Sequence, residues 1–128
     1  MTQRGVRNAW IAIGWFGVAM VIVLSLIPSP PTLPVEQGDK FEHVAAYGSL
    51  MFWFAQAYLR WNERRWIAAA LVALGIGLEY VQGWTGWRDF SYADMAADAI
   101  GVALGWLVAR GALANFLACA TRWFARAR

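Results

Sequence analysis

Apolar residues in this chain gather into four long runs that short polar segments separate. The first run, residues 9–28, contains no charged residue and is long enough to cross a hydrocarbon core of about 30 Å as a helix. Three further runs follow at residues 41–59, 66–83 and 95–113, each interrupted by only a few polar residues. The pattern predicts an all-α, polytopic membrane protein, with a single domain over residues 1–128 built as a bundle of four transmembrane helices.

Two other interpretations of the runs are weaker. A cleaved signal peptide could begin with Arg4 and Arg7, but its apolar region is normally about 7–15 residues, and the SPSPPTLP that follows is a poor cleavage site. A soluble bundle would carry more charge than 15% and fewer hydrophobic residues than 60%. Tryptophans near the ends of the runs, such as Trp10, Trp66 and Trp84, also favour a membrane, because indole rings prefer its interface.

Charge asymmetry predicts the orientation. The segments between runs are predicted loops at residues 28–38, 60–65 and 84–94, so four spans place both termini and the 60–65 loop on one side. That side carries the basic residues Arg4, Arg7, Arg60, Arg64, Arg65, Arg110, Arg122, Arg126 and Arg128, whereas the other side has only Lys40 and Arg88. Basic residues concentrate on the cytoplasmic side of membrane proteins. We therefore expect a multi-pass protein of a bacterial cytoplasmic membrane with both termini in the cytoplasm, and no nucleic-acid partner.

The C-terminal segment, residues 114–126, is open to two interpretations. It could lie along the inner surface as an amphipathic helix, or it could extend the fourth helix. Cys119 within it has no acid or histidine nearby in sequence and is expected to be an apolar filler.

Polar residues recur at helical spacing in the second, third and fourth runs, always toward the outer side. One face of each predicted helix carries such residues, and they are Asp39, Lys40, His43 and Tyr47, then Glu79 and Gln82, then Asp94 and Asp98. Because an ionised side chain is costly inside a membrane, Glu79 and Asp98 are expected to point into the bundle. Together with Arg88 from the outer loop, these residues predict a ligand-binding pocket. Gly101 and Gly105 are expected to pack against a neighbouring helix.

Structural roles compete with this interpretation for several of the residues. Asp39 and Lys40 also suit a helix N-terminus at an interface, and Asp94 suits a helix cap. His43 and Gln82 could serve only as interhelical hydrogen bonds.

The chemistry that the set could support is restricted. His43, Glu79 and Asp98 are candidates for general acid or base chemistry, although no serine or cysteine nucleophile accompanies them. The acids and the histidine could hold a hard divalent ion, but no pair has a diagnostic spacing along the chain. We therefore expect no resident metal and no cofactor.

The ordered polar positions resemble those of the VanZ-like family of small membrane proteins. The matching fragments are D-K-x-x-H-x-x-x-Y from Asp39, E-x-x-Q from Glu79, and R-x-x-x-x-x-D-x-x-x-[N/D]-x-x-G from Arg88 to Gly101. The family usually has asparagine where this chain has Asp98. The resemblance implies a role in the cell envelope and a link to teicoplanin resistance.

Three hypotheses of function remain. The first is a pocket that binds a lipid-linked or amphiphilic glycosylated ligand of the envelope, with membrane lipids around it. The second is a non-catalytic subunit whose small-residue face and C-terminal segment dock a membrane partner or a second copy. The third is an intramembrane enzyme that acts on the same substrate class through His43 and Glu79.

Overall fold

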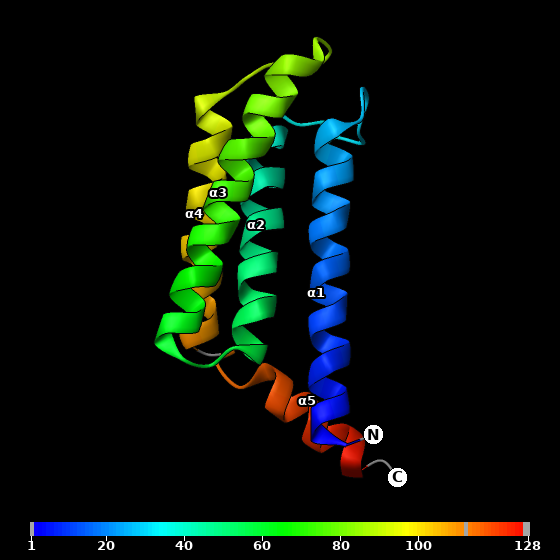
Figure 1. Ribbon diagram of the computed structural model, residues 1–128, viewed down its shortest axis with the longest axis vertical. Helices are drawn as coiled ribbons and strands as arrows, with labels where there is room; N and C mark the ends of the chain where they lie inside the picture. The colour runs from blue at the N-terminus through cyan, green and yellow to red at the C-terminus, as the bar shows by residue number, and fades with distance from the viewer. Residues whose placement is uncertain (1, 112, 127–128) are drawn as a thin grey trace.

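The computed structural model describes residues 2–111 and 113–126, and within them every regular element is a helix. The helices are α1 (Gln3–Leu26), α2 (Gly38–Ala57), α3 (Trp61–Thr85), α4 (Tyr92–Arg110) and α5 (Phe116–Arg126), as Figure 1 shows. The prediction of an all-α fold is confirmed.

All four long helices begin earlier than their apolar runs predicted, and two of these starts show the cause. The segment 60–65 was predicted as a loop, which is wrong for most of its length because α3 begins at Trp61. There a carboxylate oxygen of Glu63 accepts a hydrogen bond from the Arg60 backbone N–H (3.1 Å), which satisfies one of the groups a helix start leaves free. Similarly, α4 begins at Tyr92 because the Ser91 hydroxyl accepts from the Asp94 backbone N–H (3.2 Å).

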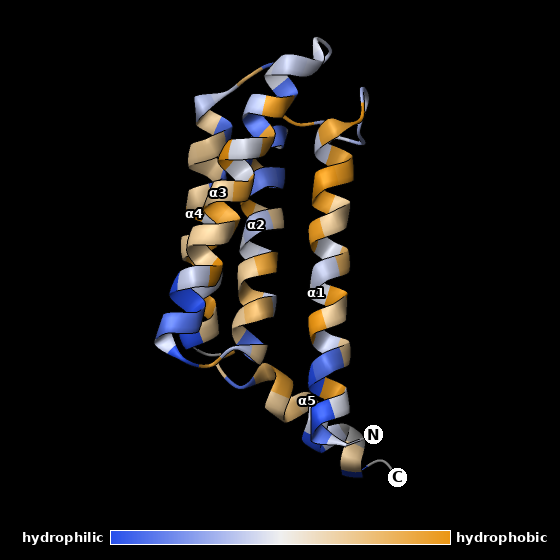
Figure 2. Cartoon of the chain, in the orientation of Figure 1, coloured by the Kyte–Doolittle hydropathy of each residue, from blue (hydrophilic) through white to orange (hydrophobic). Residues whose placement is uncertain are grey.

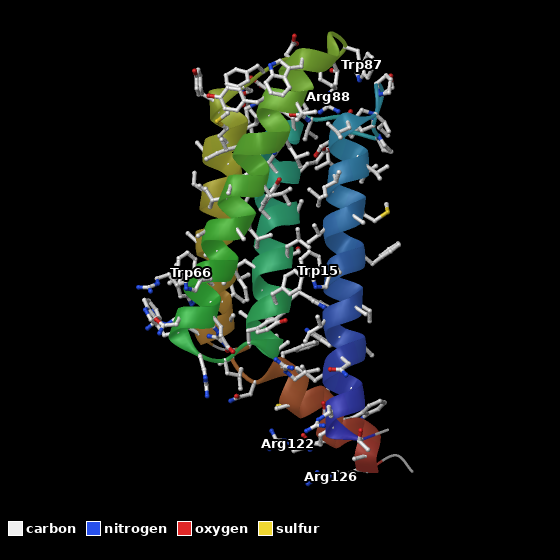
Figure 3. The ribbon with its side chains drawn as sticks, in the orientation of Figure 1. Trp15, Trp66, Trp87, Arg88, Arg122 and Arg126 are labelled. Carbon is white, nitrogen blue, oxygen red and sulfur yellow. The ribbon has the colours of Figure 1, made fainter. Side chains whose placement is uncertain are left out.

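The C-terminal segment forms a separate helix. The fourth helix ends at Arg110, and α5 begins only at Phe116, so α5 does not extend α4. In Figure 1, α5 crosses beneath the bundle, close to the start of α1. Its two basic residues, Arg122 and Arg126, lie in its second half and are labelled in Figure 3.

The four long helices run alternately up and down, so the bundle has two chemically different ends (Figure 1). One end holds both termini and the turn between α2 and α3, and we call it the basic end after its arginines. The opposite end holds the loops 27–37 and 86–91, and we call it the acidic end. Figure 2 shows hydrophilic turns at both ends and mostly apolar helix between them.

Helix α2 lies at the centre of the packing and makes its most extensive contact with α4. Its buried face includes Tyr47, Met51 and Ala55, which are at most 2% exposed. The two backbones approach closely where Gly101 and Gly105 of α4 meet α2: a Cβ at Gly101 would lie 2.5 Å from the Val44 carbonyl oxygen, and one at Gly105 would collide with the Gly48 carbonyl. Only glycine fits at this contact.

Three helices, α1, α3 and α4, are long and apolar enough to cross a membrane. Helix α2 is outside this set because its first turns carry Asp39, Lys40, Glu42 and His43. Lys40 and His43 are partly buried against acids of α4, whereas the Asp39 side chain is exposed. A membrane-associated helical protein is therefore supported, whereas the four-span arrangement belongs to the proposal below.

Candidate functional site

The polar residues predicted from the sequence meet at the acidic end, where α2, α3 and α4 converge. A direct contact joins α2 to α4: His43 Nδ1 lies 2.7 Å from Asp98 Oδ1. Asp98 is 1% exposed and packs against Gly75 of α3, where any larger residue would collide with the carboxylate. An ionised Asp98 carboxylate can only accept, so in that state the imidazole donates from Nδ1. The opposite nitrogen, Nε2, faces the rest of the cluster.

A second contact between α2 and α4 involves Lys40. Its ammonium group bonds to the neighbouring Asp39 and lies 2.7 Å from Asp94 Oδ1. Contact with two carboxylates favours the cationic form of Lys40. The other oxygen, Asp94 Oδ2, lies 3.7 Å from His43 Nε2.

Glu79 brings α3 into the same cluster. It is 1% exposed, and its Oε2 accepts a hydrogen bond from the Ser91 backbone N–H (2.9 Å). Within the described part of the chain, Glu79 makes this one hydrogen bond and no ion pair. A buried carboxylate with so little compensation is unusual, because taking a charge out of water is costly.

One set of three side chains has the composition of a metal-binding group. Single potential ligand atoms of His43, Glu79 and Asp94 all lie within 4.8 Å of one another. Each residue comes from a different helix, so no sequence spacing could reveal the set.

A cavity of about 900 Å³ opens beside this cluster, between α1 and α2 and beneath the loop 27–37. Its wall includes the apolar side chains of Val21, Leu24 and Leu33, together with the polar groups of His43 and Asp94. Arg88 also lines it and lies at the acidic end in Figure 3. The Nη1 atom of Arg88 is buried and has no hydrogen-bond partner among the described residues. Tyr47 contributes part of the wall and is 2% exposed.

Gln82 does not join the cluster. Its side-chain amide donates a hydrogen bond to the Ser25 carbonyl (2.8 Å), near the end of α1. Trp87 makes a similar contact with the Leu26 carbonyl (3.1 Å). Both residues tie the acidic end of α1 to the rest of the bundle, and in this way they help to define one side of the cavity.

Two contributors to the cluster were not predicted from the sequence. Ser91 positions both Glu79, through its backbone N–H, and the start of α4, through its hydroxyl. The S-x-x-D spacing from Ser91 to Asp94 is a helix-start signal that could have indicated the second role. Gly75 is the other, because it provides the space that the buried Asp98 carboxylate occupies.

Comparisons of the chain with protein-family models, with curated proteins and with solved structures give no match. The VanZ-like resemblance therefore rests on the ordered polar residues alone and stays a prediction.

Proposed function

We propose that the chain is a VanZ-like protein of a bacterial cytoplasmic membrane that spans the bilayer four times, with both termini in the cytoplasm and the acidic end facing outward. The three apolar helices support membrane insertion, and the arginines gathered at the basic end favour that orientation. Helix α2 crosses as the fourth span, with Lys40 and His43 paired to acids of α4 and the exposed Asp39 at its outer end.

We infer that the cavity at the acidic end binds a lipid-linked or amphiphilic glycosylated ligand of the cell envelope. One observation carries this inference: a single cavity combines a wall of apolar side chains with a rim of hydrogen-bonding and charged groups. An amphiphile requires both kinds of surface in one space, with its chain against Val21 and Leu24 and its head group near His43.

The rim has a group available for a polar or anionic head group. The buried Nη1 atom of Arg88 makes no hydrogen bond to the described residues, so its donors can be used by a bound molecule. A guanidinium group suits oxygen-rich partners such as phosphate, carboxylate or sugar hydroxyl groups.

Native mass spectrometry of the gently extracted protein tests this function. The change is Ala45→Trp, because Ala45 lines the cavity and an indole ring there would fill it. The matched control is Ala103→Trp, on an exposed position of α4 that is outside the cavity wall. We expect an amphiphile bound to the wild type and to Ala103→Trp but absent from Ala45→Trp. Equal occupancy in all three proteins, or none in any of them, would exclude the cavity as the binding site.

One observation favours a second candidate, an interaction subunit without a ligand of its own. The pairs His43–Asp98 and Lys40–Asp94 satisfy one another across α2 and α4, as structural struts would. In that case the partner would dock elsewhere than on the face of Gly101 and Gly105, which is already packed against α2. A protein subunit that co-purifies with the wild type and with both variants, without an amphiphile, would favour this candidate.

A further inference from the structure

The cluster at the acidic end leaves one buried carboxylate without a counter-charge. Lys40 pairs with Asp94 and also bonds to Asp39, and His43 pairs with Asp98. Glu79 receives no ion pair at all among the described residues, although it is 1% exposed. A buried carboxylate in this position needs either a proton or a cation nearby.

Each of the three side chains is held by a partner on one of its polar atoms. Asp98 holds His43 at Nδ1, Lys40 holds Asp94 at Oδ1, and the Ser91 backbone N–H holds Glu79 at Oε2. Each side chain therefore retains one further atom that can act as a ligand. A carboxylate behind the distal nitrogen of a histidine is the arrangement that orients metal-binding imidazoles in proteins.

The spacing of these atoms also suits a metal ion. His43 Nε2 lies 3.7 Å from Asp94 Oδ2, which is too long for a hydrogen bond between them. Two ligands bound tetrahedrally to Zn²⁺ at about 2.1 Å lie about 3.4 Å apart. Glu79 completes the set from a third helix, since one atom of each residue lies within 4.8 Å of the others.

We propose that His43, Glu79 and Asp94 bind one divalent metal ion at the acidic end of the bundle. One imidazole and two carboxylates form a mixed ligand set that favours Zn²⁺ or Mn²⁺ over Mg²⁺ and Ca²⁺, which prefer oxygen ligands alone. Asp98 is a positioning residue, because it fixes the ring of His43 without contacting the ion.

The ion would change what the cavity accepts. Carboxylates outnumber basic groups at this end, so the protein alone repels an anionic head group, apart from the local attraction of Arg88. A divalent ion beside Arg88 would attract a phosphate-bearing head group. This consequence, unlike the metal site itself, rests on the proposed amphiphile-binding function.

The test is isothermal titration calorimetry of chelator-treated, tag-free protein in a nonionic detergent, with Zn²⁺ and Mn²⁺ as probes. We expect one ion per chain in the wild type and at least about tenfold weaker binding in each of Glu79→Gln, His43→Ala and Asp94→Asn. The control is Glu36→Gln, which removes an exposed carboxylate from the loop 27–37 at the same end and should bind as the wild type does. If Glu79→Gln does not fold, the other two variants decide.

Two results would overturn the metal site: no binding of either probe to the wild type, or binding that all three variants retain. The cavity variant Ala45→Trp separates the two proposals, because it should bind the metal while it loses the amphiphile. If the wild type binds a metal but no amphiphile, the metal site is supported and the proposed function is refuted. If the wild type binds an amphiphile but neither metal, the proposed function is supported and the metal site is refuted.

Discussion

The two ends of the bundle satisfy their polar groups in different ways. At the basic end, long side chains donate to backbone carbonyls that the end of α2 leaves free: Arg7 to Ala57 (3.1 Å) and Arg64 to Ala55 (2.6 Å). Cations near a helix C-terminus also interact favourably with its dipole. Each of these contacts completes a helix end, although the buried indole N–H of Trp106, whose ring lies against Trp61, has no hydrogen-bond partner among the described residues. The contacts of Arg7 and Arg64 therefore indicate a structural role.

An aromatic pair completes the basic end. The rings of Trp10 and Trp53 stack at a centroid distance of 3.6 Å, and each indole N–H donates to the backbone carbonyl of the other residue (2.8 Å). This contact ties α1 to α2, beside the packing of Phe54 against Gly14 of α1.

At the acidic end, by contrast, side chains pair with side chains, and the pairing is incomplete. His43, Asp94 and Glu79 each keep an atom that has no strong partner, beside a cavity. Stability alone does not explain such an arrangement, because apolar residues of similar size would cost less to bury. The comparison indicates that one end holds the fold together and that the other end is available to bind.

The largest loss of stability is expected at the close contact between α2 and α4, on which both ends of the bundle depend. Gly105→Ala would place a methyl group against the Gly48 carbonyl and force α2 and α4 apart, which we expect to cost about 3 kcal/mol of unfolding free energy. The measurement is the midpoint of detergent-induced unfolding. Gly77→Ala is the control, because a Cβ there meets no heavy atom within 4 Å and should leave stability equal or higher. A similar small change in both variants would show that the close α2–α4 contact is not required.

A somewhat smaller effect is expected at the basic end. Trp53→Ala removes the stacked ring and the hydrogen bond that its indole N–H donates to the Trp10 carbonyl, and we expect a loss of about 2 kcal/mol, because Trp53 is half-buried. Binding of Zn²⁺ and of the amphiphile at the far end should stay at the wild-type level in native mass spectrometry. Loss of binding in a variant that remains folded would contradict the division between the two ends.

The sequence predicted which segments are helical better than it predicted where each helix begins and ends, for a physical reason. Apolar runs mark the part of a helix that contacts lipid, whereas a helix ends where its backbone groups find other partners. Segment 60–65 looks like a loop because it is charged, yet Glu63 accepts from the Arg60 N–H and allows the helix to begin there. The start of α4 likewise depends on a local hydrogen bond, which the Ser91 hydroxyl accepts from the Asp94 N–H. Ser91 lies outside the fourth apolar run, so the run does not reveal it.

The members of the candidate site were predictable, whereas their partners were not. An acid such as Glu79 or Asp98 inside an apolar run is conspicuous because of its insertion cost. Which acid faces His43, however, depends on how α2, α3 and α4 are rotated and shifted against one another. Asp98 contacts the imidazole directly because Gly75 leaves room for it, and no spacing within one helix encodes that contact.

A variant at the acidic end sharpens the distinction between ligands and positioning residues. Asp98→Asn retains an oxygen that can accept from His43 Nδ1 but removes the negative charge behind the ring. We expect Zn²⁺ to bind with unchanged stoichiometry and about tenfold lower affinity. Complete loss of binding, with Glu36→Gln unaffected, would mean that Asp98 is itself a ligand.

The smallest expected change in stability is also the one whose sign distinguishes a binding residue at the acidic end from a structural residue at the basic end. Glu79→Gln removes a buried charge that has one hydrogen bond and no counter-ion, so in the presence of a chelator the variant should be more stable than the wild type by about 1 kcal/mol. A structural strut would show the opposite sign, as we expect for Trp53→Ala. Addition of Zn²⁺ should then stabilise the wild type but not the variant, because only a protein that binds the ion in its folded state gains from it. The order of the two unfolding midpoints should therefore reverse between chelator and Zn²⁺, and an order that stays the same in both conditions would contradict a metal-binding role for Glu79.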